Sequence, residues 1–164
     1  MKLLVIGHAR HGKDTVCEIL RDDFGLKFEN SSSFCAKRFI YEKLKKKYGY
    51  ATYVECFNNR HNHRAEWFNL ISDYCKDDPA RLGKEIFAEN DIYCGLRNKR
   101  EFEAMQEQSV FDYCIWVDRS SHLPPESDSS MNLKPYMADF IIDNNKDFDH
   151  LKIQLVGVMK SIFK

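Results

Sequence analysis

Residues 7–15 read GHARHGKDT and give the clearest indication of how this 164-residue chain is built. They fit the pattern G-x-x-x-x-G-K, in which glycines let backbone N–H groups turn inward around phosphate oxygens. The apolar run at 3–6 predicts a buried parallel strand, and the spacing of Val16, Ile19 and Leu20 predicts a helix after the loop. A strand, a glycine-rich turn and a helix in this order predict that an anion binds at the helix N-terminus.

The residue types in this loop suit the phosphates of ATP and a magnesium ion. Gly7 and Gly12 allow the turn, and Lys13 provides a positive charge for the β- and γ-phosphates. Asp14 takes the position where a hydroxyl residue is usual, and Thr15 follows one residue later. Thr15 is therefore the candidate hydroxyl ligand of Mg²⁺. Asp14 is either a carboxylate in the shell of the metal or a charge that stabilises the helix N-terminus.

Short apolar runs alternate with helical patterns along the rest of the chain. Further strands are predicted at 26–29, 91–95, 113–117 and 140–142. Together with the strand at 3–6 they predict an α/β fold, a five-stranded parallel sheet flanked by helices. No linker divides the sequence, so residues 1–164 are expected to form a single domain.

Residues 31–90, between the second and third strands, are expected to be an insertion. The serines at 31–33 offer N-caps for its first helix, and residues 48–60 are predicted to be irregular. Trp67 has helical spacing with neighbouring apolar residues, which favours a place in the core over stacking on a nucleobase. Asp78 and Pro79 predict the N-cap and first residue of a further helix.

The predicted strand at 91–95 ends without a carboxylate. ATPases and switch GTPases hold Mg²⁺ with an acid at such a strand end, so its absence favours a small kinase in which arginines stabilise charge. Arg97 lies just beyond this strand, where open α/β sheets bind ligands. Asn98 and Glu101 then form a capping-box pattern that opens the next helix.

Three motifs in order point to one group of enzymes: the GKDT loop, the turn Gly95-Leu96-Arg97, and ADFIIDN at 138–144. The chain resembles the P-loop deoxynucleoside monophosphate kinases of bacteriophages, and more distantly dephospho-coenzyme A and phosphomevalonate kinases. The resemblance implies a P-loop NTPase kinase fold with an NMP-binding insertion at about 31–90 and an arginine-bearing lid at about 119–135.

The resemblance also implies roles for single residues. Arg10 would contact the ATP phosphates, and Asn144 would lie near the adenine. Arg97 would hold the phosphate of the acceptor, and Arg119 would approach the transferring group from the lid. The Ser- and Pro-containing stretch 119–131 reads as a loop or mobile flap. With Lys13, Arg97 and Arg119 are the candidate catalytic residues.

Further basic residues are candidates for binding the acceptor. Arg60 and Arg64 share a face if one helix includes both, and two guanidinium groups so placed clamp a phosphate. Lys37 lies in the region where the acceptor should enter. For all three the alternative is a solvated surface charge. His8 and His11 are expected to hydrogen-bond phosphate or to shape the loop.

The composition limits the remaining function classes. Lys plus Arg number 25 and Asp plus Glu number 25, which argues against a duplex nucleic-acid binder. No apolar run reaches the roughly 20 residues of a membrane span, and the mean hydropathy is −0.55. The six single cysteines and the absence of a secretory signal predict a reduced, cytoplasmic protein, in the host cytoplasm if phage-encoded. Glu126 and Asp128 are expected to balance the basic residues away from the cleft.

The sequence thus predicts a nucleotide kinase that transfers the γ-phosphoryl group of ATP, with Mg²⁺, to a (deoxy)nucleoside 5′-monophosphate. One alternative is a kinase of the same fold that acts on a small metabolite or dephospho-coenzyme A. Another is a nucleotide-binding regulator without turnover. Small nucleotides are the expected partners, without nucleic acid or membrane, and a homodimer is possible.

Overall fold

The computed structural model describes residues 1–163 and contains one all-parallel sheet. Its five strands lie in the order β2-β3-β1-β4-β5. They are β1 (Leu3–Ile6), β2 (Phe28–Asn30), β3 (Ile92–Cys94), β4 (Tyr113–Asp118) and β5 (Phe140–Asp143). The central strand β1 pairs with β3 and β4, and all four of its side chains are buried. The predicted five-stranded parallel sheet is confirmed.

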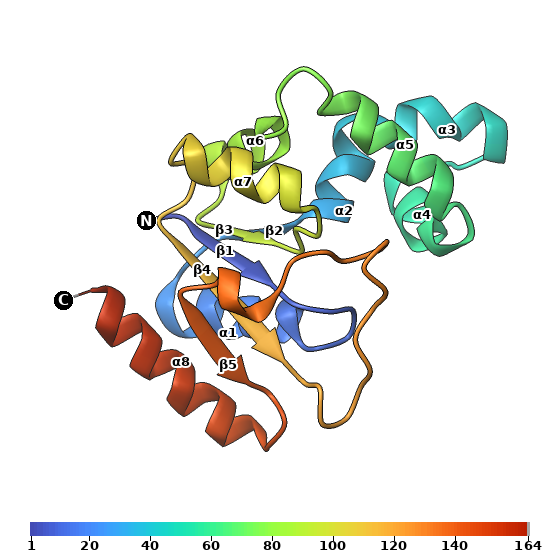
Figure 1. Cartoon of the computed structure of the whole chain (residues 1–164). Helices are drawn as coiled ribbons and strands as arrows, with labels where there is room; N and C mark the ends of the chain where they lie inside the picture. The colour runs from blue at the N-terminus through green and yellow to red at the C-terminus, as the bar shows by residue number, and fades with distance from the viewer. Residues whose placement is uncertain (164) are drawn as a thin grey trace.

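Helices cover both faces of this sheet (Figure 1). They are α1 (Lys13–Phe24), α2 (Ser31–Cys35), α3 (Tyr41–Tyr48), α4 (Tyr53–Asn58), α5 (Arg64–Tyr74), α6 (Arg81–Glu89), α7 (Lys99–Glu107) and α8 (Phe148–Ile162). Shorter turns are the π-helical η1 (Ala36–Ile40) and the 3-10 turns η2 (Arg60–Asn62) and η3 (Pro135–Met137).

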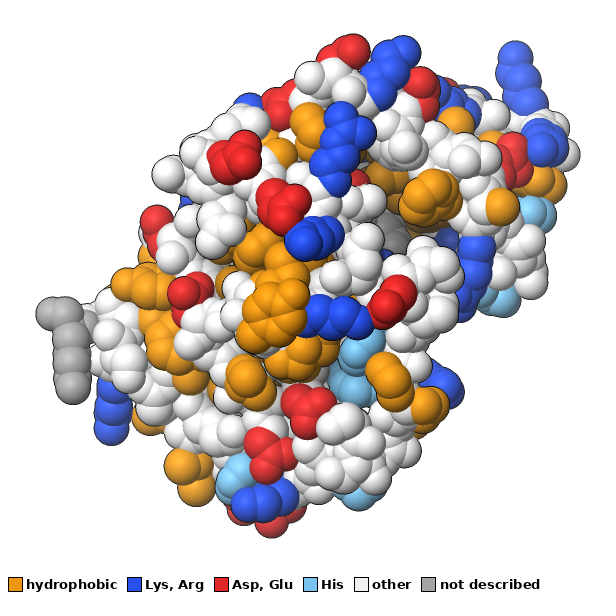
Figure 2. Space-filling model, in the orientation of Figure 1, with side chains coloured by type: hydrophobic (Ala, Val, Ile, Leu, Met, Phe, Trp, Pro, Cys, Tyr) orange, Lys and Arg blue, Asp and Glu red, His pale blue; other side chains and the backbone are white. Residues whose placement is uncertain are grey.

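The alternation of side chains along β1 divides the core into two parts. Leu3 and Val5 pack in a cluster with residues of α1 and α8. Leu4 and Ile6 point to the opposite face and pack with residues of α6, α7 and the insertion. Both faces of the strand are therefore buried from solvent, which explains its uninterrupted apolar sequence. Acidic and basic side chains lie interspersed over the face that Figure 2 shows, in keeping with the neutral total charge.

The insertion departs from the sequence prediction at three helix starts. Residues 48–60 are not irregular: α4 and η2 lie there, and the Thr52 side chain caps α4 by accepting from the Glu55 N–H at 3.3 Å. The serines at 31–33 form the first turn of α2, because the Asn30 side chain is its N-cap. Helix α6 begins at Arg81, two residues beyond Pro79, while the Asp78 carboxylate accepts from the Ala80 N–H at 3.0 Å.

Residues 119–134 form neither helix nor strand, as predicted for the flap. In Figure 1 this segment leaves β4 and returns across the carboxyl ends of the strands. Its far end is fixed, since Met131 and Leu133 are completely buried in the core. All six cysteines are buried free thiols. Among residues 1–163, none of the helices has the length and apolarity needed to cross a membrane.

Candidate active site

The GHARHGKDT loop lies between β1 and α1 and takes a backbone path that requires glycine. Gly7 and Gly12 have φ values of +146° and +95°. A Cβ at Gly7 would lie 2.5 Å from the Val117 carbonyl oxygen, and one at Gly12 would lie 2.2 Å from the Asn144 Nδ2. Sterically, only hydrogen fits at either position. The loop is therefore held against β4 and the segment after β5.

Lys13, the first residue of α1, points back into this loop. Its Nζ donates to the His8 carbonyl oxygen at 2.7 Å, and its side chain is buried. Burial lowers the pKa of this ammonium group, and within residues 1–163 no carboxylate pairs with it to compensate. The loop thus contains a partly desolvated positive charge, which favours an anionic ligand.

A carboxylate from the flap already occupies part of the loop. The Ala9 N–H donates to Glu126 Oε2 at 2.7 Å, and the Arg97 guanidinium forms an ion pair with Glu126 Oε1. Arg97 and the loop amide hold the pKa of Glu126 below its usual value, although burial alone would raise it. The sequence prediction that Glu126 balances charge away from the cleft is wrong. An anionic oxygen sits where a phosphate-binding loop presents its amides.

The two loop histidines attach the flap to the loop. The Glu126 N–H donates to His8 Nδ1 at 3.1 Å, and the Arg119 N–H donates to His11 Nδ1 at 3.0 Å. Because each Nδ1 accepts, the neutral rings carry their proton on Nε2. Burial lowers the pKa of His8 and so keeps it neutral. His11 Nε2 is buried and has no hydrogen-bond partner within residues 1–163.

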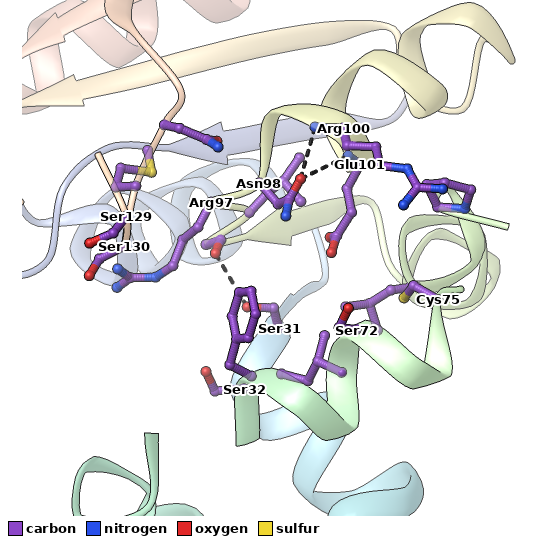
Figure 3. Close-up of a pocket in the computed structure, with 18 of the residues that line it drawn as sticks. Ser31, Ser32, Ser72, Cys75, Arg97, Asn98, Arg100, Glu101, Ser129 and Ser130 are labelled. Carbon is purple, nitrogen blue, oxygen red and sulfur yellow. Dashed lines mark hydrogen bonds between the residues drawn. The ribbon is translucent and has the colours of Figure 1, made fainter. Parts of the chain in front are cut away.

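A cavity of about 400 Å³ opens beside the loop, between the insertion, α7 and the flap. Its lining includes Arg64 and Phe68 of α5, Tyr93 of β3, Arg97, and Glu101 of α7. Figure 3 shows the Arg97 side chain pointing toward Ser129 and Ser130 of the flap, at one side of the cavity. Since Arg97 also contacts Glu126, this side of the cavity adjoins the phosphate-binding loop.

Arg60 lies near the same region, although the single helix expected for Arg60 and Arg64 is absent. Arg60 belongs to η2 and Arg64 begins α5. Burial lowers the pKa of Arg60, and the negative charge of Asp14 opposes this effect. The positive charges of Arg64 and Arg97 lower the pKa further, so the three guanidinium groups are close enough to repel. Arg60 also donates to the Phe57 carbonyl at 2.9 Å and stacks over that ring. Three like charges near one cavity favour an anionic ligand.

Four other predicted residues do not line this cavity. Lys37 pairs with Glu29 at 2.9 Å and does not line the cavity. Asn144 is buried behind the loop, where its Nδ2 donates to the His11 carbonyl at 2.9 Å, so it supports the loop backbone. Arg10 is exposed at the loop tip with φ +62°. Arg119 joins the site through its backbone N–H.

Asp14 and Thr15 are the candidate metal ligands. Asp14 is exposed in the first turn of α1, and its Oδ1 accepts from Asn30 Nδ2 at 3.3 Å and from Cys94 Sγ at 3.5 Å. Thr15 is half-buried beside it. A carboxylate and a hydroxyl next to a phosphate-binding loop match the oxygen ligands that Mg²⁺ prefers. The end of β3 carries Cys94 and Gly95 and supplies no acid, as its sequence indicated.

Three residues of this site could not be assigned to it from the sequence pattern. Glu126 contacts a residue 117 positions away, and no local pattern predicts that. Phe68 follows the buried Trp67 but is 61% exposed and lines the cavity. Glu101 matched a capping box, yet only half of that motif forms: the Asn98 side chain accepts from the N–H groups of Arg100 and Glu101. The Glu101 carboxyl turns to the cavity instead.

No protein-family model and no curated protein sequence matches the chain. Solved structures do resemble it in fold. Shikimate kinase from Bacteroides thetaiotaomicron is 10% identical with a TM-score of 0.53, and the match covers 100% of this chain and 99% of that one. Shikimate kinase from Aquifex aeolicus is 13% identical with a TM-score of 0.55, covering 99% and 98%. At these identities the likeness concerns the fold. With its strand order and its loop, the chain has the α/β fold of the P-loop kinases.

Proposed function

We propose that this protein transfers the γ-phosphoryl group of ATP to a (deoxy)nucleoside 5′-monophosphate, as the bacteriophage enzymes that it resembles do. One observation carries the proposal: a single carboxylate, that of Glu126, contacts both a loop amide and Arg97 of the cavity. An anion in the loop and an anion in the cavity therefore lie close together. Phosphoryl transfer requires this adjacency of donor and acceptor.

The nucleotide side of the site is the loop. Backbone N–H groups between Gly7 and Gly12, together with Lys13, would hold the β- and γ-phosphates, with Arg10 at the tip. Thr15 and Asp14 would hold Mg²⁺, which neutralises phosphate charge when bound. Burial of the Lys13 ammonium strengthens its attraction for a phosphate, because the local dielectric constant is low.

The acceptor side is the cavity. Arg97, with Arg64 and Arg60 nearby, would hold the 5′-phosphate of the acceptor and neutralise charge that develops during transfer. Arg119 would act from the flap. The flap is hydrogen-bonded to the loop through the side chains of His8 and His11. Its closure over bound ATP would exclude water and so suppress hydrolysis.

Lys13→Met tests this assignment. We expect the variant to fold normally and to release ADP at least about a hundredfold more slowly, the scale of one preorganised electrostatic contact. Lys46→Met, at an exposed position of α3, is the matched control and should retain full activity. ADP release is measured over a panel of ribo- and deoxynucleoside monophosphates. Equal turnover by Lys13→Met and the wild type would refute the mechanism.

A second candidate is phosphorylation of a non-nucleotide metabolite. The structures of similar fold include a shikimate kinase from Acinetobacter baumannii in complex with shikimate, 11% identical with a TM-score of 0.51, covering 99% of this chain and 92% of that one. Three arginines near the cavity favour an acceptor that already carries phosphate. ADP release with shikimate and with no nucleoside monophosphate would support the metabolite kinase. ATP binding without turnover of any acceptor would support a regulator, which Glu126 in the loop would suit.

A further inference from the structure

Glu101 has an unusual position for a glutamate. It lies in the first turn of α7 and lines the cavity, and Figure 3 shows its carboxyl group turned away from the helix toward the side that holds Ser31 and Ser72. Within residues 1–163 its carboxyl group has neither a hydrogen-bond partner nor an ion pair. A carboxylate that is removed from water without donors carries a large cost in free energy.

In the part of the chain that the structure describes, the groups that face Glu101 provide no counter-charge. Tyr93 and the thiols of Cys35 and Cys75 lie close enough for the Glu101 charge to raise their pKa values, after the larger effect of burial. The phenol and thiols are therefore neutral near pH 7. The neighbouring Arg100 points away from Glu101 in Figure 3. Burial alone raises the pKa of Glu101 to about 7. Because the carboxyl group faces the cavity and has no donor within residues 1–163, it is free to accept hydrogen bonds from a ligand.

The walls around this carboxyl group suit a flat apolar ring. Phe68, Ile71, Pro79 and Leu82 line the cavity from the insertion and from α6. Phe68 is 61% exposed, so its ring is free to stack on a ligand. The cavity thus combines an arginine beside the loop, apolar walls and one acceptor group. A polyol would leave the apolar walls without a partner, whereas a nucleobase would cover them.

We propose that Glu101 determines which acceptor is used, by accepting two hydrogen bonds from adjacent N–H donors at the edge of a nucleobase, as the N1–H and N2–H groups of guanine present them. This inference rests on the proposed function and names its substrate class. Adenine places a ring-nitrogen lone pair beside its amino group, so one carboxylate oxygen would meet an acceptor. Sites built around a buried polar group reject ligands that leave it unpaired.

The test compares dGMP, dIMP and dAMP as acceptors for the wild type and for Glu101→Gln at pH 8.5, where the Glu101 carboxyl group, with a pKa of about 7, is ionised and presents two acceptors. Each hydrogen bond to a charged group corresponds to about 10- to 100-fold. We therefore expect kcat/KM of the wild type to fall about 10-fold from dGMP to dIMP, which lacks the 2-amino group, and at least about 100-fold to dAMP. A carboxamide presents one donor and one acceptor, as adenine does, so Glu101→Gln should lose activity with dGMP and gain activity with dAMP.

Glu103→Gln is the matched control, because Glu103 lies on the same helix, is exposed and pairs with Lys99. It should leave the three kcat/KM values unchanged. An equal loss for every acceptor in Glu101→Gln would overturn the inference, since that is the result of a merely structural role. Equal kcat/KM values of the wild type for dGMP and dAMP would also overturn the inference, although the proposed function would then stand.

Binding of the three nucleotides, measured by calorimetry in the absence of ATP, separates the two proposals. If no monophosphate is phosphorylated but dGMP binds more tightly than dAMP, and Glu101→Gln reverses this order, the inference about Glu101 holds and the kinase proposal fails. If neither nucleotide binds selectively and neither is phosphorylated, both fail.

Discussion

Replacing Glu101 with glutamine should stabilise the free protein at alkaline pH, even though it removes a charged side chain. The pKa of this carboxyl group rises from the ordinary 4.5 to about 7 in the folded state. The folded state therefore keeps a proton that the unfolded chain loses, and the stability of the wild type falls as the pH rises through this window. At 1.36 kcal/mol per pKa unit, the difference between 4.5 and about 7 corresponds to about 3 kcal/mol, reached above pH 7.

The glutamine side chain does not titrate, so the comparison of the two proteins isolates this carboxyl group. Between pH 5 and pH 8 the free energy of unfolding of Glu101→Gln, relative to the wild type, should rise by about 2.5 kcal/mol. This corresponds to roughly 5–10 °C in the midpoint of thermal unfolding for a chain of this size.

Urea unfolding, followed by circular dichroism at several pH values, measures this difference directly. Glu103→Gln, at an exposed position on the same helix, is again the matched control. A constant difference between Glu101→Gln and the wild type from pH 5 to pH 8 would refute the reasoning. It would mean that the carboxyl group is solvated or paired in the folded protein.

Other predictions concern the loop and the flap. Glu126→Gln should bind ATP about tenfold more tightly, because a phosphate then no longer displaces a carboxylate from the Ala9 N–H; calorimetry measures this, and an unchanged dissociation constant contradicts it. Gly12→Ala should cost several kcal/mol of stability and abolish ATP binding, since its Cβ would lie 2.2 Å from Asn144 Nδ2. Gly25→Ala, also at positive φ but with open space around it, should cost only about 1 kcal/mol by urea unfolding, and a similar cost at both glycines would count against the steric argument. Arg97→Ala should reduce kcat at least about a hundredfold in the ADP-release assay while ATP still binds, and full activity would remove Arg97 from the mechanism.

Local sequence patterns predicted the sheet and the loop because both depend on short-range constraints. The apolar run at 3–6 has to be a strand buried on both faces, and the glycines at 7 and 12 have to lie where the backbone turns around an anion. The predicted irregular stretch at 48–60 was wrong for a local reason as well. The Thr52-x-x-Glu55 pattern is a helix start, and the structure has α4 there.

The candidate site was predictable where a residue follows directly from the loop or from a strand end, as Lys13 and Arg97 do. It was not predictable where a charged side chain can pair either with a ligand or with an oppositely charged residue of the chain. Lys37 was expected near the acceptor and instead pairs with Glu29, eight residues earlier. Such choices between ion-pair partners depend on the packing of the insertion, which the sequence pattern does not encode.

The sequence by itself determined the class of fold and the existence of a phosphate-binding loop, since strand, glycine turn and helix N-terminus are contiguous in the chain. Only the tertiary structure decided what surrounds the loop. Packing of residues 117 positions apart places Glu126 against the Ala9 N–H, and packing of α7 against the insertion leaves the Glu101 carboxyl group half-buried at the cavity wall. The pKa and the solvent exposure of a side chain depend on such long-range contacts. The sequence supplies the ionisable groups, and the fold determines which of them are buried and which are paired.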